Sequence, residues 1–294
     1  HPVHLFPVLS MDEFEQLAAD NRQIAKAMMQ SVFELACDLS GMGPFPEQVA
    51  KTRGAAPIKQ RLTEIQRQIH QLRSDLQSVR GPYLMQQLQR LGIDQHSQNL
   101  QLHIGSGPYA LDGWINLDVF PAQLSTNVLW GLPFVDGQCR YVFLSHLLEH
   151  LFYPTDALSL LQDIHRILEP GGVVRIVVPD IAQCIQAYQD HDDGFFRQRI
   201  EHWGAGDGQA TRLEHFLSYA GAGPDPAWLF EAHKFGYDFE TLQRALQRAG
   251  FRTIVRSQFM ASAHAALQVD EHSQVASAKH GDRYYSLFVE AVKQ

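Results

Sequence analysis

From residue 99 to the end of the chain, short runs of β-branched and aliphatic residues alternate with stretches whose apolar residues have helical spacing. This alternation is typical of an α/β domain built around a mostly parallel sheet. Residues 1 to about 92 are instead rich in Gln, Arg, Leu and Met and contain no convincing strand pattern. The sequence therefore predicts an N-terminal helical region over residues 1–92, followed by an α/β domain over residues 93–294.

Charge and cysteine content argue against several classes of function. The chain of 294 residues has 24 basic and 32 acidic side chains, a net charge of −8, which argues against a nucleic-acid partner. It contains no apolar run of about 18 residues, so no membrane span is expected. The 3 cysteines are widely spaced and form neither a disulfide framework nor a metal-binding pair, which favours a cytoplasmic protein.

The N-terminal region contains two long helical patterns. Residues 11–39 predict one helix, which a Ser-Gly-Met-Gly-Pro segment then ends. Residues 57–79 predict a second helix, and Gly81-Pro82 is expected to separate it from a short linking helix that ends near Gly92. The apolar positions of the second helix repeat every seven residues, at Ile58, Leu62, Ile65, Ile69, Leu72, Leu76 and Val79. This coiled-coil-like seam favours a partner helix, either the first helix in a hairpin or the same helix in a homodimer.

A glycine-rich turn opens the α/β domain. A short apolar strand over residues 100–104 runs directly into Gly105-Ser106-Gly107, and a second strand ends at Asp118, eleven residues after Gly107. Glycines let backbone N–H groups approach a ligand closely, and an acid that closes the second strand typically binds ribose hydroxyls. The third glycine of a dinucleotide fold is missing, and the gap is too short for a full crossover helix. The pattern therefore favours a nucleoside without a pyrophosphate.

Further strand and helix patterns follow in order, and together they resemble a known family. These patterns contain the strings LHIGSGPYALDGWINLD, LPF, SHLLEHL, LEPGG and PD, which lie in this order between residues 102 and 180. In this order they resemble a small bacterial group of class I S-adenosylmethionine-dependent methyltransferases, and the resemblance covers about residues 99–294. It implies a Rossmann-like α/β fold with a seven-stranded, mostly parallel sheet, helices on both faces, strand order 3-2-1-4-5-7-6 and an antiparallel last strand.

The resemblance also implies a cofactor site for S-adenosyl-L-methionine. The backbone of Gly105 and Gly107 is expected to close over the methionine part, and Asp118 to accept hydrogen bonds from the ribose hydroxyls. Adenine is expected at Asn127-Val128, where the family usually has an Asp. The remaining cofactor-binding positions in these motifs are Ser106, where the family tends to have Cys, and Ser145. Another departure is Arg140, where the family tends to have Asp.

The expected reaction is methyl transfer to a small-molecule or saccharide acceptor, with a hydroxyl of a polysaccharide precursor as the leading choice. A hydroxyl acceptor needs a general base with a near-neutral pKa, which favours histidine. We expect His146, which follows a strand, to be that base, with His233 as the second candidate and Asp180 as an orienting partner. A Gly-, His- and aromatic-rich insertion over about residues 190–236 is expected to form a lid over the acceptor.

Two alternatives belong to other classes of function. His146, Glu149 and His150 form an H-x-x-E-H string, which in a zinc hydrolase places two histidines one helical turn apart. Because the string directly follows a strand, we assign no metal to it. Glu149 and His150 alternatively brace the strand–helix junction without any chemical role. A non-catalytic oligomeric scaffold with a vestigial cofactor site is the other alternative, although intact Gly105, Gly107 and Asp118 argue against it.

Overall fold

The computed structural model describes residues 23, 55–119, 122–203, 210–220 and 232–294. The chain divides into two compact units, residues 1–87 and 88–294. The predicted helix over residues 11–39 lies outside the described residues, apart from residue 23. None of the helices in the described ranges is long and apolar enough to cross a membrane.

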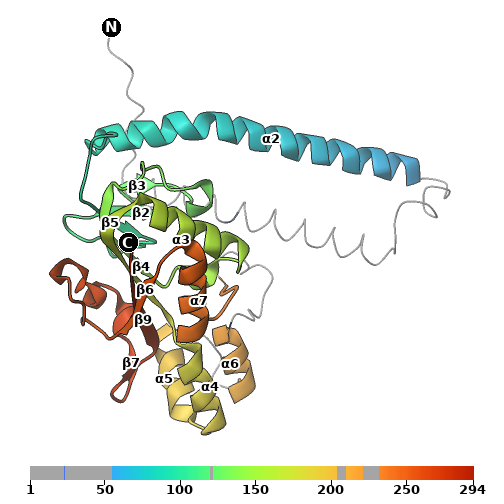
Figure 1. The fold of residues 1–294 in the computed structure, drawn as a ribbon. Helices are drawn as coiled ribbons and strands as arrows, with labels where there is room; N and C mark the ends of the chain where they lie inside the picture. The colour runs from blue at the N-terminus through green and yellow to red at the C-terminus, as the bar shows by residue number, and fades with distance from the viewer. Residues whose placement is uncertain (1–22, 24–54, 120–121, 204–209, 221–231) are drawn as a thin grey trace. The chain divides into compact units, whose positions relative to one another are not determined.

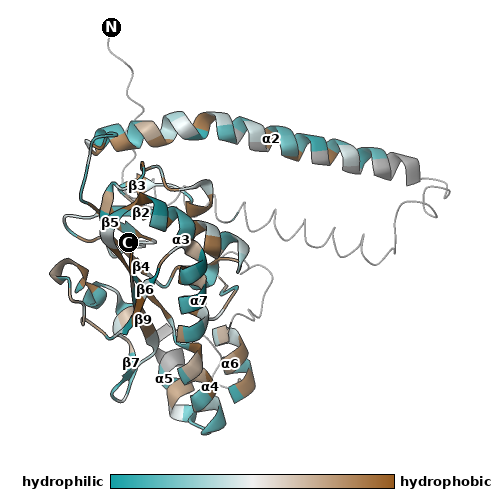
Figure 2. Ribbon diagram, viewed as in Figure 1, coloured by the Kyte–Doolittle hydropathy of each residue, from teal (hydrophilic) through white to brown (hydrophobic). Residues whose placement is uncertain are grey.

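Helix α2 (Ala55–Arg90) is a single helix of 36 residues, so the predicted break at Gly81-Pro82 is wrong. Both residues are exposed, and the carbonyl that Pro82 leaves without a helical donor is therefore accessible to water. Good helix formers such as Leu84 and Met85 follow at once and continue the helix. Figure 2 shows apolar residues scattered along a mostly hydrophilic helix. The seam positions with a described side chain are exposed by 42–59%: Ile65, Ile69, Leu72 and Val79.

The second unit contains a seven-stranded sheet in the order β3-β2-β1-β4-β5-β9-β6 (Figure 1). Its strands are β1 (Leu100–Ile104), β2 (Ile115–Asp118), β3 (Leu124–Ser125), β4 (Cys139–Ser145), β5 (Leu168–Pro179), β6 (Thr253–Ser257) and β9 (Ser286–Val292). Strand β9 is antiparallel to both β5 and β6, and all other strand pairs of this sheet are parallel. The predicted fold class and strand order are confirmed.

Helices and short helical turns connect the strands. The α-helices are α3 (Thr155–Ile167), α4 (Ile181–Gln189), α5 (Asp193–Trp203), α6 (Arg212–Ala220), α7 (Phe239–Ala249) and α8 (Gln274–Ser277). The 3-10 turns are η2 (Val128–Trp130), η3 (Leu148–His150), η5 (Ala265–Leu267) and η6 (Asp270–His272). Strands β7 (Lys279–His280) and β8 (Arg283–Tyr284) form a separate hairpin.

Local sequence signals set the limits of α7. The Asp238 carboxylate accepts a hydrogen bond from the Thr241 amide, and Gly250 ends the helix in the left-handed conformation. Helix α7 packs against α3, and both contact the sheet. Helix α3 ends at Ile167, and residues 169–172 of the LEPGG string form the start of strand β5.

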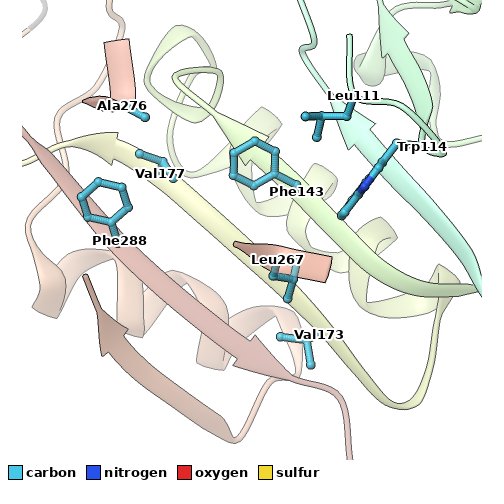
Figure 3. Packing of buried hydrophobic residues seen from close by; sticks show 8 residues of the cluster. All are labelled: Leu111, Trp114, Phe143, Val173, Val177, Leu267, Ala276 and Phe288. Carbon is cyan, nitrogen blue, oxygen red and sulfur yellow. The ribbon is translucent and has the colours of Figure 1, made fainter. Parts of the chain in front are cut away.

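The opposite face of the sheet is covered by the 259–276 segment and the loop after β1. Phe143 of β4 and Val177 of β5 point into an apolar cluster with Trp114, Leu267 and Ala276 (Figure 3). Residues 173–179 of β5 are buried without a break, as expected for a strand covered on both faces. This packing fixes the ends of β4 and β5, from which the functional side chains project.

The predicted lid over residues 190–236 contains helices α5 and α6 among its described residues. These helices pack against α4 and against each other, as Figure 1 shows. Their apolar contacts include Phe195, Phe196 and Tyr219, which meet Tyr285 at the end of the β7–β8 hairpin. These three described aromatic residues thus belong to a small apolar core that the insertion shares with α4 and Tyr285.

Candidate functional site

The Gly105–Gly107 turn lies at the point in the sheet where the strand order reverses. Strand β1 pairs with β2 on one side and with β4 on the other, and such a switch point opens a ligand crevice at the carboxyl ends of the strands. Gly105 and Gly107 have φ angles of +72° and +50°, which favour glycine. A Cβ atom on Gly105 would also lie 3.1 Å from the Cβ of Leu147. The turn therefore lies directly beside the segment that follows β4.

Asp118, at the end of β2, holds this turn. Its carboxylate accepts hydrogen bonds from the Gly107 amide at 2.8 Å and from the Val119 amide at 2.6 Å. The amides of Gly105 and Ser106 donate to the Leu117 carbonyl at 2.8 and 3.2 Å. The structure thus brings Asp118 together with the glycine turn, as a site for a ribose diol requires.

The other predicted cofactor residues end the neighbouring strands. Asn127 and Val128 follow β3, and the Asn127 side-chain oxygen accepts a hydrogen bond from the Leu129 amide at 2.9 Å. Ser145 ends β4 and is buried, and its hydroxyl donates to Ser273 Oγ at 3.2 Å. Both side chains therefore have intramolecular partners at the same edge of the sheet.

His146 leaves β4 in a left-handed conformation, with φ +53°. This conformation is uncommon for a residue other than glycine and is typical of functional turns. Its Nδ1 lies 3.1 Å from Glu149 Oε1, and its Nε2 lies 2.9 Å from Ser286 Oγ. A carboxylate only accepts, so Nδ1 carries the proton and Nε2 accepts from the Ser286 hydroxyl. The imidazole is thereby fixed in one tautomer and one orientation.

Glu149 is a fully buried carboxylate surrounded by imidazoles. The residue is 1% exposed, and neither side-chain oxygen receives a well-aligned hydrogen bond from the described residues. Burial alone raises the pKa of Glu149, but His146, His150 and His233 outweigh burial and hold this pKa below its ordinary value. The cluster therefore favours an ionised Glu149.

The segment that contains His233 lies alongside Glu149 and His150. The amide of Lys234 donates to the Glu149 carbonyl at 2.7 Å, and the Lys234 ammonium donates to the His150 carbonyl at 2.9 Å. The imidazoles of His150 and His233 meet edge to face with centroids 4.9 Å apart. Tyr237 follows, completely buried, and its hydroxyl has no hydrogen-bond partner among the described residues.

Asp180 has a different environment from the one that the sequence suggested. Its carboxylate caps α4 through the Ala182 amide at 3.1 Å and pairs with Arg256 at 2.9 Å. The buried carboxylate that lies next to His146 is that of Glu149. Sequence reasoning treated Glu149 as a brace or as part of a zinc string, and its burial beside three histidines was not visible in the sequence.

The helical zinc arrangement is not formed. His146 lies in a left-handed turn and His150 ends η3, which has only three residues, so the two histidines do not lie one turn apart on a helix. Instead, one ligand atom each of Glu149, His150 and His233 lies within 4.8 Å of the others. The long sequence separation of His233 explains why local spacing did not indicate this cluster.

Residues 114–176 match the family model described as "Methyltransferase domain". This match supports the predicted methyltransferase assignment, and the sheet has the strand order that was predicted with it. No curated protein matches the sequence.

Several solved structures of methyltransferases resemble the chain. The Haemonchus contortus phosphoethanolamine N-methyltransferase 2 complex with S-adenosyl-L-methionine is 16% identical, with a TM-score of 0.36 over 71% of this chain and 51% of that one. A Thermotoga maritima S-adenosylmethionine-dependent methyltransferase, a possible histamine N-methyltransferase, is 15% identical over 78% and 97%, with a TM-score of 0.36. An Archaeoglobus fulgidus S-adenosylmethionine-dependent methyltransferase is 16% identical over 76% and 94%, with a TM-score of 0.37. The chain spans about half the length of the nematode enzyme.

Proposed function

We propose that this chain transfers a methyl group from S-adenosyl-L-methionine to a hydroxyl of a small-molecule or saccharide acceptor. The observation that carries the proposal is the contact between the Gly105–Gly107 turn and the segment that follows β4. Gly105, in the turn that Asp118 holds, lies against Leu147, and His146 and Glu149 lie on either side of Leu147 in the chain. A nucleoside site and a base–carboxylate pair therefore share the carboxyl edge of β1 and β4.

The chain's residues divide into a binding set and a proton-handling set. In the binding set, the Asp118 carboxylate accepts from the ribose hydroxyls, the turn amides hold the methionine part, and Asn127-Val128 hold the adenine ring. Ser106 and Ser145 support this set from β1 and β4. When bound, the cofactor supplies a methyl group that its sulfonium has already activated, so the protein mainly needs to orient the acceptor and remove its proton.

His146 is our candidate for the proton acceptor. Glu149 holds its Nδ1 proton, which leaves Nε2 available for an acceptor hydroxyl that replaces Ser286. The side chain of His146 is 13% exposed, so it lies at the boundary between core and crevice. His233 is the second candidate and lies on the other side of Glu149. Asp180 serves this arrangement indirectly, because it fixes the start of α4.

The proposal also covers the class of acceptor, the cellular location and the assembly of the enzyme. We place the acceptor among the precursors of polysaccharide biosynthesis, and the enzyme in the cytoplasm as a homodimer formed through its N-terminal helices. The saccharide assignment follows from the family resemblance described above. The buried free thiols of Cys139 and Cys184 are compatible with a reducing compartment.

The test is calorimetric titration with S-adenosylhomocysteine. We expect a Kd in the micromolar range, about −8 kcal/mol. Asp118→Ala is expected to weaken binding by about 1.5–3 kcal/mol, because hydrogen bonds to a charged group are lost. Asp112→Ala, an exposed aspartate in the same region of the chain, is the matched control and is expected to bind like the wild type. Absence of binding by the wild type rejects the proposal and favours the scaffold alternative.

A further inference from the structure

We propose that Glu149, His150 and His233 form a binding site for one divalent metal ion. The three residues come from two segments that lie far apart in the sequence, and one ligand atom of each lies within 4.8 Å of the other two. Two imidazole nitrogens and one carboxylate oxygen are a donor set that Zn²⁺, Mn²⁺ and related ions accept.

The state of Glu149 is an independent observation in favour of a bound cation. A buried carboxylate whose oxygens lack well-aligned donors is costly, because burial removes its water shell and a contact such as that with His146 replaces it only in part. Glu149 is 1% exposed, and both of its oxygens lack a well-aligned donor among the described residues. One oxygen is near His146 Nδ1, and the second is available to a metal ion. A cation here would satisfy a group that the protein itself leaves unsatisfied.

The backbone and the outer contacts prepare the two histidines. His233 Nδ1 lies 3.0 Å from the Tyr219 carbonyl, and this outer contact orients the imidazole within the cluster. The Lys234 amide and the Glu149 carbonyl hold the two segments together at 2.7 Å. The Lys234 ammonium is directed to the His150 carbonyl and lies 5.6 Å from the ring centre of Phe152.

Metal binding requires only a small contraction of this cluster. Ligand atoms at about 2.1 Å from a metal ion are roughly 3–3.5 Å from one another in tetrahedral or octahedral geometry. The distances between the ligand atoms, which are now at most 4.8 Å, therefore need to shorten by about 1–2 Å. Small side-chain rotations supply this movement. His150 and His233 are partly exposed, so three protein ligands leave open coordination positions on the solvent side.

The open positions indicate what the ion does, and this step rests on the proposed function. The site adjoins His146, and Leu147, which precedes Glu149 by two residues, lies against Gly105 of the glycine turn. In octahedral geometry an ion with these three ligands has three open positions, enough to bind two neighbouring oxygens, as in a vicinal diol. It would orient the acceptor and lower the pKa of the bound hydroxyl.

The experiment measures metal binding separately from activity. Protein without an affinity tag is treated with EDTA, dialysed and titrated with MnCl₂, and then with ZnCl₂, in a calorimeter. We expect one equivalent to bind to the wild type, and Glu149→Gln, His150→Asn and His233→Asn each to weaken that binding at least tenfold. His264→Asn is the matched control, because it removes an imidazole that contacts Tyr141 outside the cluster. Its affinity and stoichiometry are expected to remain unchanged.

Two results would overturn the site. One is no binding of either ion by the wild type, and the other is equal binding by all three ligand variants, which would assign the ion to other histidines. Far-ultraviolet circular dichroism identifies a variant that fails to fold, and the two remaining variants then decide. S-adenosylhomocysteine titration of the same samples separates the two proposals. Cofactor binding without metal binding rejects only the metal site, and the reverse rejects only the proposed function.

Discussion

His103 is a buried titratable residue within β1. It lies outside the cluster that Glu149 forms with His146, His150 and His233. It is 4% exposed, and its Nδ1 lies 3.1 Å from Asn116 Oδ1. Burial lowers the pKa of His103 to about 4, although the hydrogen bond to Asn116 opposes this shift. The unfolded chain, with an ordinary histidine pKa of about 6.5, therefore binds the proton more tightly than the folded one. The stability that neutral His103 contributes is complete above pH 6.5 and is lost as the pH falls towards 4.

We expect this single residue to make unfolding strongly dependent on pH. Between pH 7.5 and pH 4.5 it should remove about 2–3 kcal/mol from the free energy of unfolding. Urea denaturation of the wild type and of His103→Gln at both pH values measures the effect. The variant is expected to be less stable at pH 7.5 but to lose about 2 kcal/mol less on acidification. An equal loss in the two proteins would mean that other groups carry the pH dependence.

His146→Ala tests the proposed proton acceptor at the same scale. The variant removes the imidazole between Glu149 and Ser286, and turnover is expected to fall by a factor of about 10²–10⁴. Affinity for S-adenosylhomocysteine is expected to stay within about twofold, because His146 does not belong to the proposed cofactor-binding set. Ser286→Ala is the companion variant and should keep most of the activity, since its hydroxyl is displaced by the acceptor. Near-wild-type turnover by His146→Ala would assign the proton to another group.

At the scale of elements, α2 has an apolar seam that stays exposed among the described residues. Ile65 and Leu72 are 42% and 55% exposed, and burying such side chains on a partner helix is favourable. We expect Ile65→Asp with Leu72→Asp to dissociate a homodimer. Ser74→Asp with Gln77→Asp adds the same charge at exposed polar positions and is the matched control. Light scattering measures the mass, and an unchanged mass in the seam variant would favour a hairpin within one chain.

A buried ion-pair network joins three elements behind the site. Arg175 of β5 is completely buried and donates to Asp270 of η6 at 2.8 and 2.6 Å and to Glu290 of β9 at 2.7 Å. Asp270→Ala removes two charge-assisted hydrogen bonds from the buried guanidinium and leaves Arg175 paired only with Glu290, so it should lower the free energy of unfolding by about 3–5 kcal/mol. Glu169→Ala breaks the partly exposed pair with Arg140 and should cost less than about 1 kcal/mol. Equal losses in urea denaturation would contradict this ranking.

Sequence patterns predicted the elements well where the signal was local. The strands that end at Ile104, Asp118 and Ser145 were visible because each apolar run stops at a glycine, an acid or a polar residue. The break predicted in helix α2 at Pro82 was wrong. A Gly-Pro pair in the sequence does not reveal that the carbonyl left without a helical donor is accessible to water. The Arg175 network and the pairing of Glu149 with His233 were not predictable, since they depend on contacts between segments far apart in the chain.

At the scale of the whole molecule, the nucleoside site joins strands β1 and β2 through the contact between Gly107 and Asp118. A ligand that binds only the folded chain stabilises it by mass action. S-adenosylhomocysteine at about 100 times its Kd should therefore add about 2.7 kcal/mol to the free energy of unfolding. At the same concentration, Asp118→Ala is expected to gain only about 0.4–1.4 kcal/mol, because its affinity is roughly 10–100 times lower.

The α2 seam variant distinguishes a local site from one that depends on assembly. If the second unit alone holds the cofactor, Ile65→Asp with Leu72→Asp should show the full ligand-induced stabilisation. Thermal unfolding with and without S-adenosylhomocysteine measures this, at several protein concentrations because dissociation of a dimer also shifts the transition. If the seam variant showed no stabilisation by S-adenosylhomocysteine, the N-terminal helices would be part of the cofactor site. The geometry of the Gly105–Gly107 turn favours the first result, since all of its contacts described above lie within residues 88–294.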